Sequence, residues 1–120
     1  MSGLFTDVLW SETERLRKAI DDLEFLRRLA DGTLPLEVFR TYIDQDALYL
    51  AGYAKALALL AARCPDPATA GFWARASATT ATVELSLHQN LVRGGTLPEP
   101  AVPPTHSPAC LGYVSYLIAA

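Results

Sequence analysis

Apolar residues recur along this chain at helical spacing, and the alternating pattern typical of β-strands is almost absent. Leucine and alanine, which favour helices, dominate the sequence. The pattern predicts an all-α fold. We expect helices at residues 4–20, at 22–30 after a cap at Asp21 or Asp22, at 35–63, at 67–93 and at 109–120.

Glycine and proline mark the predicted helix ends. Gly32 accepts the left-handed conformation that stops a helix, and Pro35 suits the first helical position because its φ is already fixed. Asp66 followed by Pro67 repeats this arrangement of cap and first position. Residues 94–107 hold four prolines, too many for a helix or a central strand, so we expect an extended surface loop there.

Composition limits the class of protein. The chain has 120 residues, 51% hydrophobic and 19% charged, so it can bury one core and is too apolar to be disordered. Its net charge is -3, and its lysines and arginines are scattered along the chain instead of clustered. Both features argue against binding to nucleic acid or to an anionic membrane. The apolar run at 47–62 is shorter than the roughly 20 residues of a membrane span. With two cysteines and no signal peptide, we expect a cytoplasmic protein.

The last predicted helix is still apolar where the sequence stops. Leu111, Val114, Leu117 and Ile118 are followed by no cap and no polar tail, and an apolar helix needs neighbours to pack on. We therefore expect partner helices to be missing, so that residues 1–120 form the N-terminal part of a single helical domain.

One face of the long central helix carries an unusual polar pattern. At about 100° per residue, Asp46 falls within roughly 60° of Tyr42, Tyr49 and Tyr53. A carboxylate in so apolar a helix must find hydrogen-bond donors, which the tyrosines could supply, or serve a ligand. Spacing alone leaves open a purely structural network. We interpret Asp44, on the opposite side, as part of a solvated edge.

A second polar stripe on the following helix could face the first; its members are Ser77, Thr80, Glu84 and His88. Helical bundles build dinuclear metal sites from Glu-x-x-His, but here the spacing is one residue longer, so we expect a hydrogen-bonded or solvated pair and no metal. Cys110, near a helix start, could be a thiolate nucleophile. We interpret it instead, like Cys64, as a small core residue, and we expect His106 to be exposed.

Several segments resemble the TenA (thiaminase II) family. The family's D-G-T-L-P turn, F-x-x-Y and Q-D-x-x-Y-L are matched at 31–35, 39–42 and 45–50. V-E-L-S-L-H at 83–88 is similar to its E-x-x-L-H stretch, and S-P-A-C-L-G-Y-V-S from residue 107 is similar to its S-P-T-x-x-x-Y-T-S segment. The resemblance therefore covers almost the whole chain.

The resemblance implies a haem-oxygenase-like helical bundle. It also implies a hydrolase of thiamin metabolism that releases or salvages the 4-amino-2-methylpyrimidine unit, with no metal or organic cofactor and a homotetrameric assembly. Position by position, it implies that Asp46 hydrogen-bonds the aminopyrimidine, Tyr49 lies beside it and Tyr113 lines the pocket from the last helix. Glu84 would be a supporting acid nearby.

The sequence departs from the family at the catalytic positions. The nucleophilic cysteine of an L-L-P-C-like stretch and a late glutamate have no counterpart here, and Cys110 does not occupy the place of the nucleophile. The resemblance thus identifies no catalytic residue, and we expect this chain alone to be an incomplete enzyme. The alternatives are a non-catalytic pyrimidine-binding or oligomer-forming helical module and, with less support, a metal-dependent oxidase. The exact pyrimidine substrate stays open.

Overall fold

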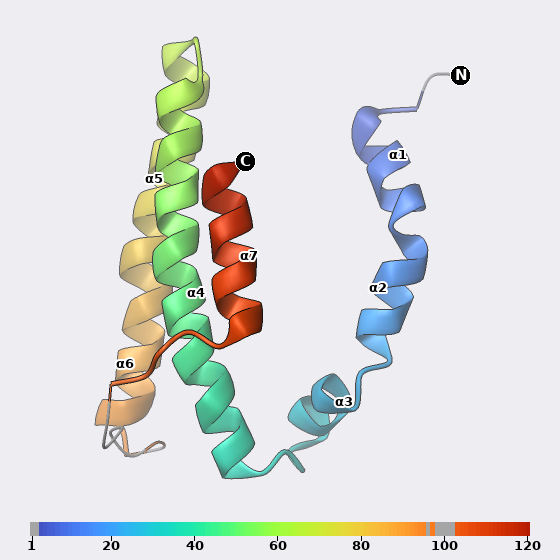
Figure 1. Ribbon diagram of the computed structural model, residues 1–120, viewed down its shortest axis with the longest axis vertical. Coiled ribbons are helices and arrows are strands. Elements are labelled where there is room, and N and C mark those ends of the chain that lie inside the picture. The colour runs from blue at the N-terminus through green and yellow to red at the C-terminus, as the bar shows by residue number, and fades with distance from the viewer. Residues whose placement is uncertain (1–2, 96, 98–102) are drawn as a thin grey trace. The chain divides into compact units, whose positions relative to one another are not determined.

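The computed structural model describes residues 3–95, 97 and 103–120. These residues form helices and connecting turns with no strand among them, which confirms the all-α fold class (Figure 1). The chain divides into two compact units between Phe39 and Arg40. No helix in the described ranges is long and apolar enough to cross a bilayer.

The first unit contains three short helices, α1 (Phe5–Glu12), α2 (Glu14–Asp21) and α3 (Glu24–Asp31). The prediction of one continuous helix at 4–20 is therefore wrong. The break lies at Thr13, which has φ -95° and ψ 3°. Its hydroxyl donates to the carbonyl oxygen of Leu9 at 2.8 Å, the kind of local side-chain bond that competes with a regular helix.

The start of α3 differs from the prediction, and its end agrees with it. Neither Asp21 nor Asp22 caps this helix; Leu23 occupies the N-cap position and makes no side-chain capping bond. At the other end Gly32 has φ 78°, the left-handed conformation that the sequence predicts for a helix stop. The chain then turns back onto the end of the helix, where Thr33 N–H donates to the carbonyl oxygen of Arg28 at 3.0 Å.

Helix α4 (Leu36–Arg63) runs through the centre of the second unit, and its bounds differ by only one residue from the predicted 35–63. Ile43, Ala54 and Leu57 on this helix are buried and supply much of the small core. Helices α5 and α6 lie along one side of α4, and α7 lies along the other (Figure 1). α4 is therefore flanked by helices on both sides.

The predicted helix at 67–93 is present but is not regular; it consists of α5 (Pro67–Thr79), the π-helical segment η1 (Thr80–Glu84) and α6 (Leu85–Arg93). A π-helical turn holds more residues than an α-turn, so it changes which side chains face inward after it. Thr80 is buried, and the next partly buried side chains are Leu85 and His88. Glu84, which regular spacing would place beside Thr80, is exposed.

Two close approaches hold the neighbouring helices against α4. On one side, the hydroxyl of Ser77 donates to the carbonyl oxygen of Ala54 at 2.6 Å. On the other side, Gly52 lies so close to α7 that an added Cβ would be 2.3 Å from Cγ1 of Val114. Small residues on α4 therefore set the spacing of both interfaces.

Helix α7 (Pro108–Ala119) begins as predicted, with the Ser107 side chain as its cap; the oxygen accepts from Cys110 N–H at 3.2 Å. Of the predicted proline loop, residues 96 and 98–102 lie outside the described residues, and 103–107 are non-helical as expected. One face of α7 packs Val114 into the core, whereas Leu111 on another face is 53% exposed. The expectation of missing partner helices stays a prediction.

Candidate functional site

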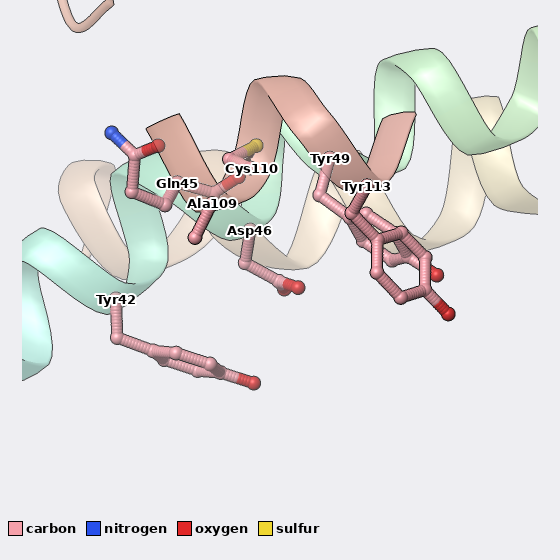
Figure 2. Close-up of a pocket in the computed structure, with 7 residues that line it drawn as sticks. All are labelled: Tyr42, Gln45, Asp46, Tyr49, Ala109, Cys110 and Tyr113. Carbon is pink, nitrogen blue, oxygen red and sulfur yellow. Dashed lines mark hydrogen bonds between the residues drawn. The ribbon is translucent and has the colours of Figure 1, made fainter. Parts of the chain in front are cut away.

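A pocket of about 410 Å³ lies between the first half of α4 and the start of α7. Its lining combines tyrosines, one carboxylate, one amide and one thiol: Tyr42, Gln45, Asp46, Tyr49, Ala109, Cys110 and Tyr113. Three of the four residues that the resemblance assigns to substrate binding are thus brought together. In Figure 2 the carboxylate of Asp46 points to the same side as the hydroxyl groups of Tyr42 and Tyr113.

The Asp46 carboxylate is partly buried and is held by a residue from another helix. Nε2 of His88 on α6 lies 2.9 Å from Oδ2 of Asp46, and the two side chains are 14% and 25% exposed. An imidazole is thus the partner of Oδ2 in the structure. Asp46 also lines the pocket, so its carboxylate can be reached by a ligand.

Tyrosine rings form the wall beside Asp46. Tyr49 stacks on Tyr53 with ring centroids 5.6 Å apart, and Tyr113 meets Tyr49 edge-on at 5.3 Å. Burial, together with the neighbouring Tyr113, raises the pKa of Tyr49 to about 12. Burial, followed by the charge of Asp46, also raises the pKa of Tyr42. Both phenols therefore keep their protons at neutral pH, and the carboxylate supplies the negative charge of the pocket.

Gln45 is a site residue that sequence reasoning missed. Its Nε2 donates to the carbonyl oxygen of Thr105 at 2.9 Å, and its Oε1 accepts from Ser107 N–H at 2.8 Å. The amide thereby binds the segment before α7 to α4 and fixes where α7 begins. In Figure 2 it points away from Asp46. Gln45 could have been found from the sequence, because it stands next to Asp46 in the Q-D-x-x-Y-L motif.

Cys110 also faces this pocket. It is half-buried, and its Sγ lies 3.6 Å from the carbonyl oxygen of Gln45, so the thiol can donate there. The interpretation of Cys110 as a small core residue is therefore wrong: it is a wall residue of the pocket. Cys64 is likewise half-buried, and both cysteines are free.

Glu84 does not join the other predicted site residues. Its side chain is exposed and is absent from the pocket lining, because the π-helical segment turns it away from α4. The second polar stripe does meet α4, but through Ser77 and His88. Within the described ranges no three side chains of His, Cys, Asp or Glu gather as metal ligands. His106 is exposed, as predicted.

The interpretation of Asp44 as part of a solvated edge is wrong. Its carboxylate is 25% exposed and accepts from Nε of Arg40 at 3.1 and 3.2 Å through its two oxygens. Arg40 itself is 15% exposed. The two aspartates of α4 thus have different partners: Asp44 has an arginine of its own helix, and Asp46 has a histidine of another.

Comparison with known proteins adds relatives of the same fold. The sequence profile of the TENA/THI-4/PQQC family matches residues 13–120. Thiamine biosynthesis multifunctional protein ThiED of Corynebacterium efficiens is 41% identical over 118 residues, which are 98% of this chain and 16% of that protein. The aminopyrimidine aminohydrolase of Bacillus subtilis is 37% identical over 65 residues, 54% of this chain and 28% of that protein.

A solved structure of the same family resemblance is also similar to this chain. The TenA homologue from P. horikoshii OT3 superimposes with a TM-score of 0.85 at 30% identity, covering 95% of this chain and 54% of that one. The chain thus spans about half the length of this solved relative. The match shows the haem-oxygenase-like helical fold that the resemblance implies. The chain belongs to the TENA/THI-4/PQQC family.

Proposed function

We propose that the pocket between α4 and α7 binds the 4-amino-2-methylpyrimidine ring of thiamin or its breakdown products. We further propose that the protein acts as a hydrolase of thiamin salvage or degradation. One observation carries the binding proposal: Asp46 presents a carboxylate, with one oxygen held by His88, inside a pocket walled by tyrosines.

The chemistry of the ring fits this arrangement. An exocyclic amino group on a pyrimidine is a hydrogen-bond donor, and a carboxylate oxygen is a strong acceptor for it. The flat apolar faces of the ring pack well on aromatic side chains, which Tyr49 and Tyr113 supply. The pocket volume of about 410 Å³ lies within the roughly 300–1,000 Å³ of small-molecule sites.

Hydrolysis is proposed from the relatives rather than from the pocket. One relative is named an aminopyrimidine aminohydrolase, and another is named for thiamine biosynthesis. In the family mechanism that the resemblance implies, a cysteine thiolate adds to the ring and the group on the exocyclic methylene leaves. Water then adds to the methylene and the thiolate is released, with carboxylates moving the protons. Asp46 fits the binding part of that scheme.

The binding proposal is tested by calorimetric titration with 4-amino-5-hydroxymethyl-2-methylpyrimidine. Asp46→Asn should weaken binding by about tenfold or more, because a hydrogen bond to a charged acceptor is lost. Asp44→Asn is the matched control, since Asp44 lies on the same helix but outside the pocket lining. An analogue with hydrogen in place of the 4-amino group should bind wild type weakly. Equal affinity of wild type and Asp46→Asn would contradict the proposal.

Hydrolysis is tested separately with 4-amino-5-aminomethyl-2-methylpyrimidine. Release of ammonia together with the hydroxymethyl product supports the enzyme. Tight binding without release is what residues 1–120 should give both as an incomplete enzyme and as a pyrimidine-binding module, because the nucleophilic cysteine of the family has no counterpart in them.

A further inference from the structure

Among the described residues, His88 contacts the pocket through Asp46. It does not line the pocket, and it comes from α6 rather than from α4 or α7. We propose that His88 is a positioning residue, whose Nε2–H holds Oδ2 of Asp46 so that Oδ1 is presented to the ligand. This inference rests on the proposed pyrimidine binding and goes beyond it, because it names what aims the carboxylate.

The geometry favours an orienting role. An aspartate on a helix has rotamer freedom and a terminal torsion with a broad energy profile, so a free carboxylate would point in several directions. The 2.9 Å contact with Nε2 removes that freedom before any ligand arrives. A site whose acceptor is already oriented loses less entropy on binding, and the ligand therefore binds more tightly.

The surroundings of the second imidazole nitrogen, Nδ1, bear on which nitrogen of His88 carries the proton. Nδ1 is buried and has no hydrogen-bond partner in the described part of the chain. With the proton on Nε2, Nδ1 is a bare acceptor, whereas a doubly protonated ring would bury a donor with no acceptor. The contact with Oδ2 therefore calls for a proton on Nε2.

The π-helical segment lies just before the helix that carries His88. It precedes α6, and after it His88 faces α4 while Glu84 faces solvent. The same irregularity that removes the glutamate from the pocket thus leaves the histidine beside Asp46. π-Helical turns of this kind are common at functional sites.

The test compares two substitutions of His88 in the same pyrimidine titration. His88→Leu removes the donor and should weaken binding by about tenfold. His88→Gln places an amide nitrogen near the position of Nε2 and should restore most of the affinity. The exposed histidine gives a control, since His106→Gln should bind like wild type. Circular dichroism and thermal unfolding of each variant show whether it folds.

A double-mutant cycle separates positioning from general loss of structure. If His88 acts through Asp46, His88→Leu should change affinity little further in an Asp46→Asn background. The same tenfold loss in both backgrounds would overturn the proposal, as would wild-type affinity of His88→Leu. If Asp46→Asn itself binds like wild type, the proposed function fails first. If Asp46→Asn loses affinity and His88→Leu does not, only the role of His88 fails.

Nitrogen NMR of the histidine rings gives a readout without ligand. The chain has two histidines, so His106→Gln leaves a single ring to assign. Wild type should show the Nε2–H tautomer of His88, and Asp46→Ala should shift the ring toward a mixture of tautomers. A mixture already present in wild type would contradict the proposal.

Discussion

Replacing Gly52 by alanine adds one methyl group where α4 and α7 approach each other. The added Cβ would lie 2.3 Å from Cγ1 of Val114, 3.1 Å from Cγ2 and 3.3 Å from Cβ. Ordinary carbon contacts lie at about 3.5–4.0 Å. Val114 is buried and β-branched, so it has essentially one side-chain rotamer in a helix and cannot turn away. Helix α7 must therefore move by roughly 1 Å.

Two opposing terms set the size of the effect. Overpacking of this kind costs about 1–3 kcal/mol, and alanine in a helix interior gains about 1 kcal/mol over glycine. We expect a net loss of about 1 kcal/mol in the free energy of unfolding. That corresponds to a Tm lower by roughly 4 °C for a domain of this size. Because Tyr113 precedes Val114, pyrimidine affinity should fall as well.

Thermal and urea unfolding of a matched pair of glycine variants measure this loss. Gly112→Ala on α7 adds its Cβ in open space, so it should gain up to about 1 kcal/mol instead. Val114→Ala should recover much of the loss in the Gly52→Ala background, and the two changes should then be non-additive. If Gly52→Ala stabilises the protein as much as Gly112→Ala does, the close approach of α4 and α7 is refuted.

Three further predictions concern other parts of the second unit. Gln45→Leu removes both bonds to the segment before α7, so hydrogen exchange at Ser107 N–H should speed up; unchanged exchange would show that the amide does not hold this segment. Burial and Tyr113 raise the pKa of Tyr49 to about 12 in the folded protein, from 10.0, so its contribution to stability is complete below pH 10 and is lost as the pH rises toward 12. Tyr49→Phe should therefore flatten the alkaline fall in stability measured by urea unfolding, and an equally steep fall would contradict the assignment. Ser77→Ala should lower stability by about 1 kcal/mol, because the carbonyl of Ala54 loses its 2.6 Å partner, and an unchanged urea midpoint would argue against that contact.

The ends of the long helices could be predicted from the sequence because local chemistry determines them. Gly32 stops α3, and a proline stands next to the first residue of α4 or at the first position of α5 and α7. The break at Thr13 and the π-helical segment could not be predicted in this way. Both depart from regular spacing without a glycine or proline, so the apolar pattern continues through them.

The sequence likewise predicts only those parts of the site that depend on the spacing within one helix. Asp46 and Tyr49 share a face of one helix, so helical spacing alone brings them together. Tyr113 entered only through the family resemblance. The contacts of Asp46 with His88, and of Gln45 with Ser107, join helices that are far apart in sequence. Such partners depend on how the helices pack, which the periodicity of one helix does not specify.

A crystal structure of the protein with 4-amino-5-hydroxymethyl-2-methylpyrimidine tests the central claim most directly. We expect the ring against Tyr49 and Tyr113, with its exocyclic nitrogen about 3 Å from Oδ1 of Asp46 and the contact between His88 and Oδ2 intact. A ring bound elsewhere on the protein, or bound in this pocket with its amino group turned away from Asp46, would contradict the account.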